Sequence, residues 1–441
     1  MSLTDRFGNA LTSSSADAVD LYNSALDALL AMQPMCSDLI QRALVCDPGF
    51  ALAHCVLARS LVLEGKNPQA FAAIDRAQEL TVGLTPRERA HVEIVAMVTR
   101  GQTAQALPLV KAHAAEYPRD VLPLSFTVGV YGLFGFGGYV NHHELQLEFL
   151  QSVASHWDDA WWFSASLGWS HVEVLQLDTG IPMLERSLQQ KADNASAVHG
   201  RTHGYYERGQ AAEGAEFIAD WLPGYDRAGP LHCHLAWHQA LFSLQQGDVE
   251  NAAEIYRESI RPDVSQAMPM FTIVDCTALL WRFQLHGISV NDKDVDRLVK
   301  FMEKTFPSTA IPFVNVHAVM AYALAGDHES VARRLNEVAD LVAADRQNSG
   351  PVVLHLCQAV KAYAEGMTQQ AVRLLDQARP QWSALGGSNA QRDVFFETLL
   401  GAVILDGDRK AANKLALERS GQRSAHLGQA WFDRFKPQVR V

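Results

Sequence analysis

Glycines recur along this sequence at an almost constant interval. From Gly209 onward the steps between turn-forming glycines are 38, 40, 39, 40 and 41 residues, and these glycines are Gly247, Gly287, Gly326, Gly366 and Gly407. Gly65 and Gly101 mark the first part of the chain in the same way. Between the glycines, apolar residues recur at threes and fours, as in amphipathic helices, and no stretch alternates like a strand. A fixed period of this length predicts stacked helical hairpins rather than a single globule.

A small residue follows the turn glycines at a fixed distance. Five positions after a glycine stand Ala70, Ala106, Ala252, Ala371 and Ala412. A small side chain at one place in the second helix of each hairpin lets the two helices pack closely. The predicted fold class is therefore all-α, an α-solenoid of about ten antiparallel helical hairpins.

The two ends of the chain differ from the repeats, although residues 1–441 are expected to form one continuous helical-repeat domain. Residues 1–35 precede the repeats, and Thr12-Ser13-Ser14-Ser15 offers N-cap residues for a helix that begins near Ala16. Residues 414–441 are basic and polar, which fits a C-terminal capping helix with one solvated face. The glycine-rich run YGLFGFGGYVNHH lacks a phosphate-loop pattern and predicts a bent connection.

Composition narrows the environment and the class of partner. The net charge is -12 and no run of Lys or Arg is present, which argues against nucleic acid as a partner. No window approaches the roughly 18 apolar residues of a membrane span, so no membrane association is expected. The six cysteines form no CxxC pair and indicate buried free thiols in a reducing compartment. We expect a cytoplasmic protein, and a homo-oligomer is compatible with the sequence. The aromatic cluster of Trp157, Trp161, Trp162, Phe163 and Trp169 is expected to pack in the core.

Several segments together resemble a known family. They are TDRFG, HGRTHGYYERGQAAEG, HLAWHQALFSLQQGD, VDCTALLWR and VNVHAVMAYALAGD, spread from residue 4 to residue 327. The chain resembles the tetratricopeptide-repeat superfamily and is most similar to the tetratricopeptide repeat protein 38 family, although its repeats exceed the usual length of about 34 residues. The resemblance implies a cytosolic helical-repeat fold and assigns no reaction.

The histidines are numerous and are not scattered. The chain has 17, and two pairs stand four residues apart, so each pair shares one face of a helix. His171, His238 and His317 lie nine residues before Gly180, Gly247 and Gly326, each taken as the turn that closes its helix. In tetratricopeptide-type hairpins the first helix lines the concave surface. We therefore expect one shared groove lined by His199, His203, His234, His238 and His317.

The leading hypothesis is that this groove binds a small polar or anionic ligand, or a peptide. Imidazole and guanidinium groups would anchor polar groups of the ligand, and tryptophans would form an apolar floor. The predicted ligand-binding residues are His199, His203, His234, Trp237, His238, Asp275, Trp281, Arg282 and His317.

Three alternatives stay open at this point. Each histidine could simply be a polar residue bonded to the neighbouring hairpin. An enzyme could use His203 or His238 with Asp275 for acid–base chemistry, or a metal for hydrolysis. The leading hypothesis of ligand binding needs no cofactor. In the metal-dependent alternative, a divalent metal such as zinc would bind His199, His203, His234 and His238. The sequence contains no HExxH motif. A protein–protein interaction scaffold is the last alternative.

Overall fold

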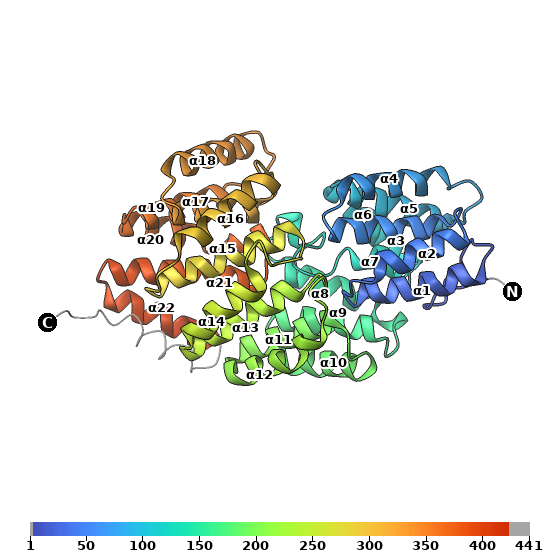
Figure 1. Cartoon of the computed structure of the whole chain (residues 1–441), viewed down its shortest axis with the longest axis horizontal. Coiled ribbons are helices and arrows are strands. Elements are labelled where there is room, and N and C mark those ends of the chain that lie inside the picture. The colour runs from blue at the N-terminus through green and yellow to red at the C-terminus, as the bar shows by residue number, and fades with distance from the viewer. Residues whose placement is uncertain (1–2, 423–441) are drawn as a thin grey trace. The chain divides into compact units, whose positions relative to one another are not determined.

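The computed structural model describes residues 3–422, and these residues fold mainly into helices. The β structure within that range is one isolated bridge between Thr4 and Ala10. In the part of the chain that the structure describes, no helix is both long and apolar enough to span a membrane. Successive helices run back and forth as antiparallel hairpins (Figure 1), so the predicted all-α helical-repeat class is confirmed.

The described chain divides into two compact units. Unit 1 comprises the described residues of Met1–Gly137, His143–Arg201 and Ala228–Leu231. Unit 2 comprises the described residues of Gly138–His142, Thr202–Arg227 and His232–Val441. The single continuous domain expected from the glycine period stays a prediction.

The helices of residues 16–190 form the first part of the array. They are α1 (Ala16–Leu30), α2 (Cys36–Cys46), α3 (Ala51–Leu63), α4 (Asn67–Glu79), α5 (Pro86–Thr99), α6 (Thr103–Glu116), α7 (Val121–Ser125), η1 (Gly135–Gly137), α8 (His142–Val153), η2 (Ala154–His156), α9 (Trp161–Glu173) and α10 (Leu177–Gln190). The irregular stretch between α7 and α8 contains the glycine-rich run, as predicted.

The helices of residues 195–422 follow. They are α11 (Ala195–Arg208), α12 (Ala211–Trp221), η3 (Leu222–Gly224), α13 (His232–Gln246), α14 (Val249–Ile255), η4 (Tyr256–Ile260), α15 (Pro269–Leu285), α16 (Asp292–Thr305), α17 (Pro312–Leu324), α18 (His328–Ala343), α19 (Val352–Ala364), α20 (Thr368–Ala378), η5 (Trp382–Leu385), α21 (Asn389–Leu405) and α22 (Arg409–Gln422). Part of the predicted cap at 414–441 belongs to α22, and residues 423–441 lie outside the described residues.

The periodic glycines end the first helix of each hairpin, as predicted. All eight have φ between 66° and 84°, the left-handed conformation that glycine adopts without steric cost: Gly65, Gly101, Gly209, Gly247, Gly287, Gly326, Gly366 and Gly407. The alanines five positions later are at most 3% exposed. Both signals therefore mark tight helix–turn–helix units.

Gly180 is not a turn glycine, and this prediction was wrong. It lies inside α10, and the turn before that helix is made by Leu175 with φ 63°. A Cβ atom at Gly180 would lie 2.6 Å from the carbonyl oxygen of Gly168 in α9. The glycine is therefore used for close approach of two helices, a role that its position in the sequence does not distinguish from a turn.

The segment before the first helix packs against later helices of unit 1. Ser15 caps α1 by accepting a hydrogen bond from the backbone of Ala18, which confirms the predicted start. Arg87 donates to the carbonyl of Ala10 at 2.7 Å, and the Thr12 hydroxyl donates to Glu88 at 2.7 Å. These bonds anchor the N-terminal segment to α5.

The predicted core aromatics and thiols are buried. All five residues of the aromatic cluster are at most 9% exposed, and the rings of Trp157 and Phe163 stack with centroids 5.1 Å apart. The six cysteines are free, and five of them are buried as predicted, whereas Cys46 is exposed. The aromatic cluster and the five buried thiols therefore serve packing.

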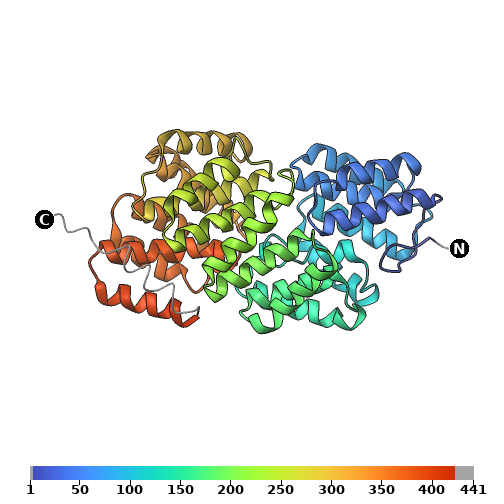
Figure 2. The ribbon, with the colours of Figure 1, turned by 60° about the horizontal axis from the view of Figure 1, so that its bottom comes forward.

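The last hairpin of unit 2 folds back onto earlier helices of the same unit. α21 packs against α20 and α22, its neighbours in the chain, and also against α15. In Figure 2 the red helices of this hairpin lie beside green and yellow helices of unit 2. Every residue of α21 from Ala390 to Val403 is buried, including the three charged residues Arg392, Asp393 and Glu397. α21 therefore covers α15, which is the first helix of its own hairpin.

Candidate metal centre

Two helices at the start of successive hairpins carry the four central histidines. His199 and His203 lie one turn apart on α11, and His234 and His238 lie one turn apart on α13. The helix between them, α12, packs against α13. Gly214 of α12 permits this close packing, because a Cβ atom there would lie 2.6 Å from the Phe242 ring. The hairpin thus brings two i,i+4 histidine pairs together.

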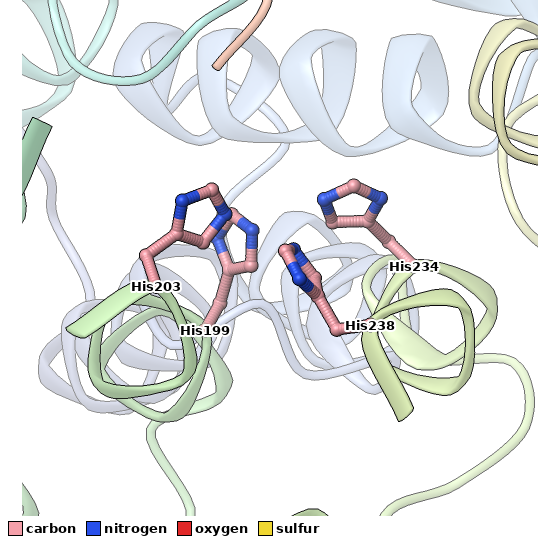
Figure 3. Close-up of side chains that lie close together, drawn as sticks. All are labelled: His199, His203, His234 and His238. Atoms are coloured by element: carbon pink, nitrogen blue, oxygen red, sulfur yellow. The ribbon is translucent and has the colours of Figure 1, made fainter. Parts of the chain in front are cut away.

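The four imidazoles converge on one point. One nitrogen from each of His199, His203, His234 and His238 lies within 4.8 Å of each of the other three. Figure 3 shows the rings of each pair extending from their own helix toward the rings of the other pair. Ring centroids are 4.5 Å apart for His203 and His238, and 4.8 Å apart for His234 and His238. His203 and His238 are fully buried, and His199 is partly exposed.

A carboxylate orients one of these imidazoles. Nδ1 of His234 lies 3.0 and 2.9 Å from the two carboxylate oxygens of Asp275 on α15, and both side chains are buried. Since a carboxylate accepts, Nδ1 carries the proton, and Nε2 keeps a lone pair for a ligand. The sequence predicted Asp275 as a partner of His203 or His238. That pairing was wrong, because the register of α13 and α15 places His234 against Asp275.

An aromatic ring and an arginine also support His234. The ring of Trp237 stacks on His234 with centroids 5.2 Å apart. Arg282 of α15 lies 5.5 Å from the centre of the same indole. Its Nε forms an ion pair of 2.9 Å with Glu397 of α21, and its Nη2 donates to the carbonyl of Ala390 at 3.1 Å. The sequence predicted that Arg282 faces a ligand, but its side chain instead contacts other residues of the protein.

The sequence did not predict that Glu397 and Asp393 lie near the histidines. The Tyr206 hydroxyl donates to Asp393 at 2.6 Å, and the Tyr206 ring lies 6.5 Å from the ring of His238. Both acids lie on α21, so they reach the neighbourhood of the histidines from far along the chain. The available signal was charge in an otherwise apolar helix, a pattern that marks buried polar contacts.

Two predicted groove residues lie elsewhere. His317 of α17 is not among the four converging histidines; its Nδ1 donates to the Phe313 carbonyl at 2.7 Å, and its ring packs near Phe313 and Phe395. Burial lowers the pKa of His317 to about 4, so it is neutral at pH 7. Trp281 donates its Nε1 proton to Thr398 at 2.9 Å and is fully buried. Equal offsets from successive turns therefore do not bring all five histidines together.

Several carboxyl groups are buried in the neighbourhood of the histidines. Asp275, Glu207, Asp393 and Glu397 are each at most 9% exposed. Arg282 contacts one of these acids, Glu397. Burial raises the pKa of Asp275, and the contacts with His234 and Arg282 act in the opposite direction. Carboxylates in such surroundings are stabilised by added positive charge nearby.

The donor set is also a suitable one for a metal. Neutral imidazole nitrogen is a ligand for zinc, copper, nickel and iron, whereas magnesium and calcium prefer oxygen. Zinc–nitrogen bonds of about 2.0 Å in a tetrahedron place the four nitrogens about 3.3 Å apart. The four nitrogens already lie within 4.8 Å of one another, so small side-chain rotations would bring them to bonding distance around one ion. Among the described residues this is the one group of three or more such donors that meets that limit.

Comparisons with known proteins return solved structures of low sequence identity to this chain. No family model matches the chain. A human IFIT1 dimer with m7Gppp-AAAA is 15% identical with a TM-score of 0.46, and covers 96% of this chain and 95% of that chain. A tetratricopeptide repeat protein from Parabacteroides merdae is 14% identical with a TM-score of 0.34, covering 72% and 98%. Yeast Tom70 is 12% identical with a TM-score of 0.32, covering 96% and 88%. The resemblance to the tetratricopeptide repeat protein 38 family stays a prediction.

Proposed function

We propose that this protein binds a divalent first-row transition metal through His199, His203, His234 and His238. The convergence of four imidazole nitrogens within 4.8 Å is the observation that carries the proposal. Four histidines on two helices form a preorganised donor set, so binding needs little rearrangement of the backbone. The chain would be a metal-binding helical-repeat protein.

The surroundings of the histidines support the same conclusion. Histidine ligands in metal sites commonly donate their second ring proton to a carboxylate, and the His234–Asp275 pair has this arrangement. A divalent cation would also interact favourably with the buried carboxylate of Asp275. Imidazole ligands bring no charge of their own, so the full charge of the ion would be available for this.

A small polar ligand in the same place is the second candidate. The partial exposure of His199 favours it, because a molecule could approach the cluster from that side. A peptide in a long concave groove is supported less well, since α21 already packs on α15 and engages Trp281 and Arg282. The expected exclusion of nucleic acid and the cytoplasmic location stay predictions.

Metal-assisted hydrolysis requires a coordination position beyond the four histidines. A tetrahedral zinc ion held by four protein ligands has no position for water or substrate, as in structural zinc sites. Catalysis at this centre would therefore need a five- or six-coordinate metal, or the departure of one ligand. His199 is the ligand most suited to leave, because it alone of the four is partly exposed.

A metal titration tests the proposal. Chelator-stripped protein is titrated with Zn²⁺ and, separately, with Co²⁺, whose visible absorption reports the donor set and geometry. We expect one ion per chain, with at least a hundredfold weaker binding in His203→Ala and His238→Ala. His328→Ala is the matched control, because His328 has a side chain 74% exposed and should bind as the wild type does.

Each outcome decides between the candidates. Saturable binding that both buried-histidine variants lose supports a metal centre. Equal binding in the wild type and in both variants, or no binding at all, contradicts the metal centre. The binding of a small polar ligand would then be the better hypothesis for the four histidines.

A further inference from the structure

We infer that Arg282 and Glu397 are positioning residues for the metal ligand His234, so that metal affinity depends on the docking of α21. The inference rests on the proposed metal centre and adds a control element to it. Neither residue is one of the four converging donors. Arg282 acts through Trp237, which contacts His234, and Glu397 acts through Arg282.

His234 is held on two sides of its ring. Asp275 accepts from its Nδ1 at 2.9 Å, and Trp237 stacks against its face at an interplanar angle of 13°. One contact selects the tautomer, and the other fixes the plane of the ring. Together they decide whether Nε2 is directed toward the other three imidazoles.

Arg282 is linked to both of these supports. Its guanidinium carbon lies 5.5 Å from the centre of the Trp237 ring, a distance typical of a cation–π interaction. Its charge also stabilises the ionised form of Asp275. A displaced Arg282 would therefore loosen the indole and weaken the carboxylate that orients His234.

The position of Arg282 is set in turn by α21. Glu397 forms an ion pair of 2.9 Å with its Nε, and the carbonyl of Ala390 accepts from Nη2 at 3.1 Å. α21 also contacts neighbouring helices through Asp393, which accepts from Tyr206, and through Thr398, which accepts from Trp281. The contacts run without a break from α21 through α15 to the ligand on α13.

The coupling must act in both directions. If docked α21 raises the affinity for metal, bound metal must favour docked α21 by the same free energy. Removal of the carboxylate that orients a metal-bound histidine costs about 10- to 100-fold in metal affinity. Arg282 acts one contact further away and Glu397 two, so for each we expect a loss at the lower end of this range, about tenfold.

The test compares metal affinity in matched variants of the full chain. Zn²⁺ dissociation constants are measured for the wild type, Glu397→Gln, Arg282→Lys and Asp406→Asn. Asp406 is the exposed residue directly after α21, so its substitution removes the same charge without a contact to Arg282. We expect about tenfold weaker binding in Glu397→Gln and Arg282→Lys, and no change in Asp406→Asn.

Hydrogen exchange of the wild type gives a second measurement that depends on no variant. Amides of α21 should exchange more slowly after Zn²⁺ is added, by a factor similar to the loss of affinity in Glu397→Gln. Unchanged affinity in the two variants, or unchanged exchange in α21 despite bound metal, overturns the coupling and leaves the metal centre standing. Failure of the wild type to bind metal overturns the metal centre itself.

Discussion

Asp275 places both of its carboxylate oxygens within 3.0 Å of Nδ1 of His234, which links α15 to α13 inside unit 2. The two residues are 41 positions apart, close to one period of the glycine repeat. The repeat therefore brings the carboxylate of one hairpin against the imidazole of the previous one. This contact gives His234 a defined tautomer before any metal arrives.

Replacement of Asp275 by asparagine should weaken the proposed metal centre. Asparagine has nearly the same shape, but its neutral oxygen is a poorer acceptor for the Nδ1 proton of His234. We expect a 10- to 100-fold loss of Zn²⁺ affinity with little change in the helical content. Competition with a chromophoric chelator measures the affinity, and circular dichroism checks the fold. Unaltered affinity would show that Asp275 has only a packing role.

Removal of metal should lower the stability of the protein. An ion that binds only the folded chain stabilises it by about 2.7 kcal/mol when its free concentration is a hundred times the dissociation constant. We expect the melting temperature to fall when metal-loaded protein is treated with a chelator and to recover with excess Zn²⁺. The same treatment of His203→Ala should produce no shift, and an equal shift there would place the ion elsewhere.

His317 should make the protein sensitive to mild acid. Burial lowers its pKa in the folded chain to about 4 from the ordinary 6.5, and the charge of Arg282 acts in the same direction. Between these two values the unfolded chain binds the proton and the folded chain does not, so stability falls as pH decreases. The full contribution, reached near pH 4, is about 3 kcal/mol.

The variant His317→Gln removes this group and should reduce the loss of stability between pH 6.5 and pH 4. Urea unfolding at several pH values measures the slope. His328→Gln is the control, because that side chain is 74% exposed. Equal slopes in the wild type and in His317→Gln would refute this assignment.

Gly180→Ala should destabilise the hairpin of α9 and α10. The added methyl group would lie 2.6 Å from the Gly168 oxygen and 3.0 Å from carbon atoms of His171 and Val172. Such overpacking costs about 1–3 kcal/mol. Gly224→Ala is the control, since a Cβ atom there meets nothing within 4 Å. Urea denaturation should separate the two variants, and equal stabilities would contradict the close packing of α9 on α10.

The hairpin architecture could be predicted because each of its signals is local. A left-handed turn needs glycine, close helix packing needs alanine, and a helix start needs a cap such as Ser15. Each of these requirements acts within a few residues. Gly180 shows the limit, because glycine serves equally well where two helices touch. Only the partner helix, through Gly168, distinguishes the two uses.

The candidate site could be predicted in part. The i,i+4 pairs are visible in the sequence, and the period brings adjacent hairpins together, so the four histidines were identified. The assignment of Asp275 to His234 depends on the register between α13 and α15, which no local pattern fixes. The contacts of Glu397 and Asp393 depend on the return of α21 onto α15, a long-range feature without a signal in the glycine period.

Elemental analysis combined with X-ray absorption tests most directly whether the four histidines hold a metal ion. Protein purified without chelator is analysed for first-row transition metals, and the absorption edge of the bound metal is then measured. We predict one ion per chain, with a first coordination shell of nitrogen at about 2.0 Å and the signature of imidazole rings. The His238→Ala variant should contain much less metal. A metal content no greater than in that variant, or a first shell of sulfur, would contradict the account.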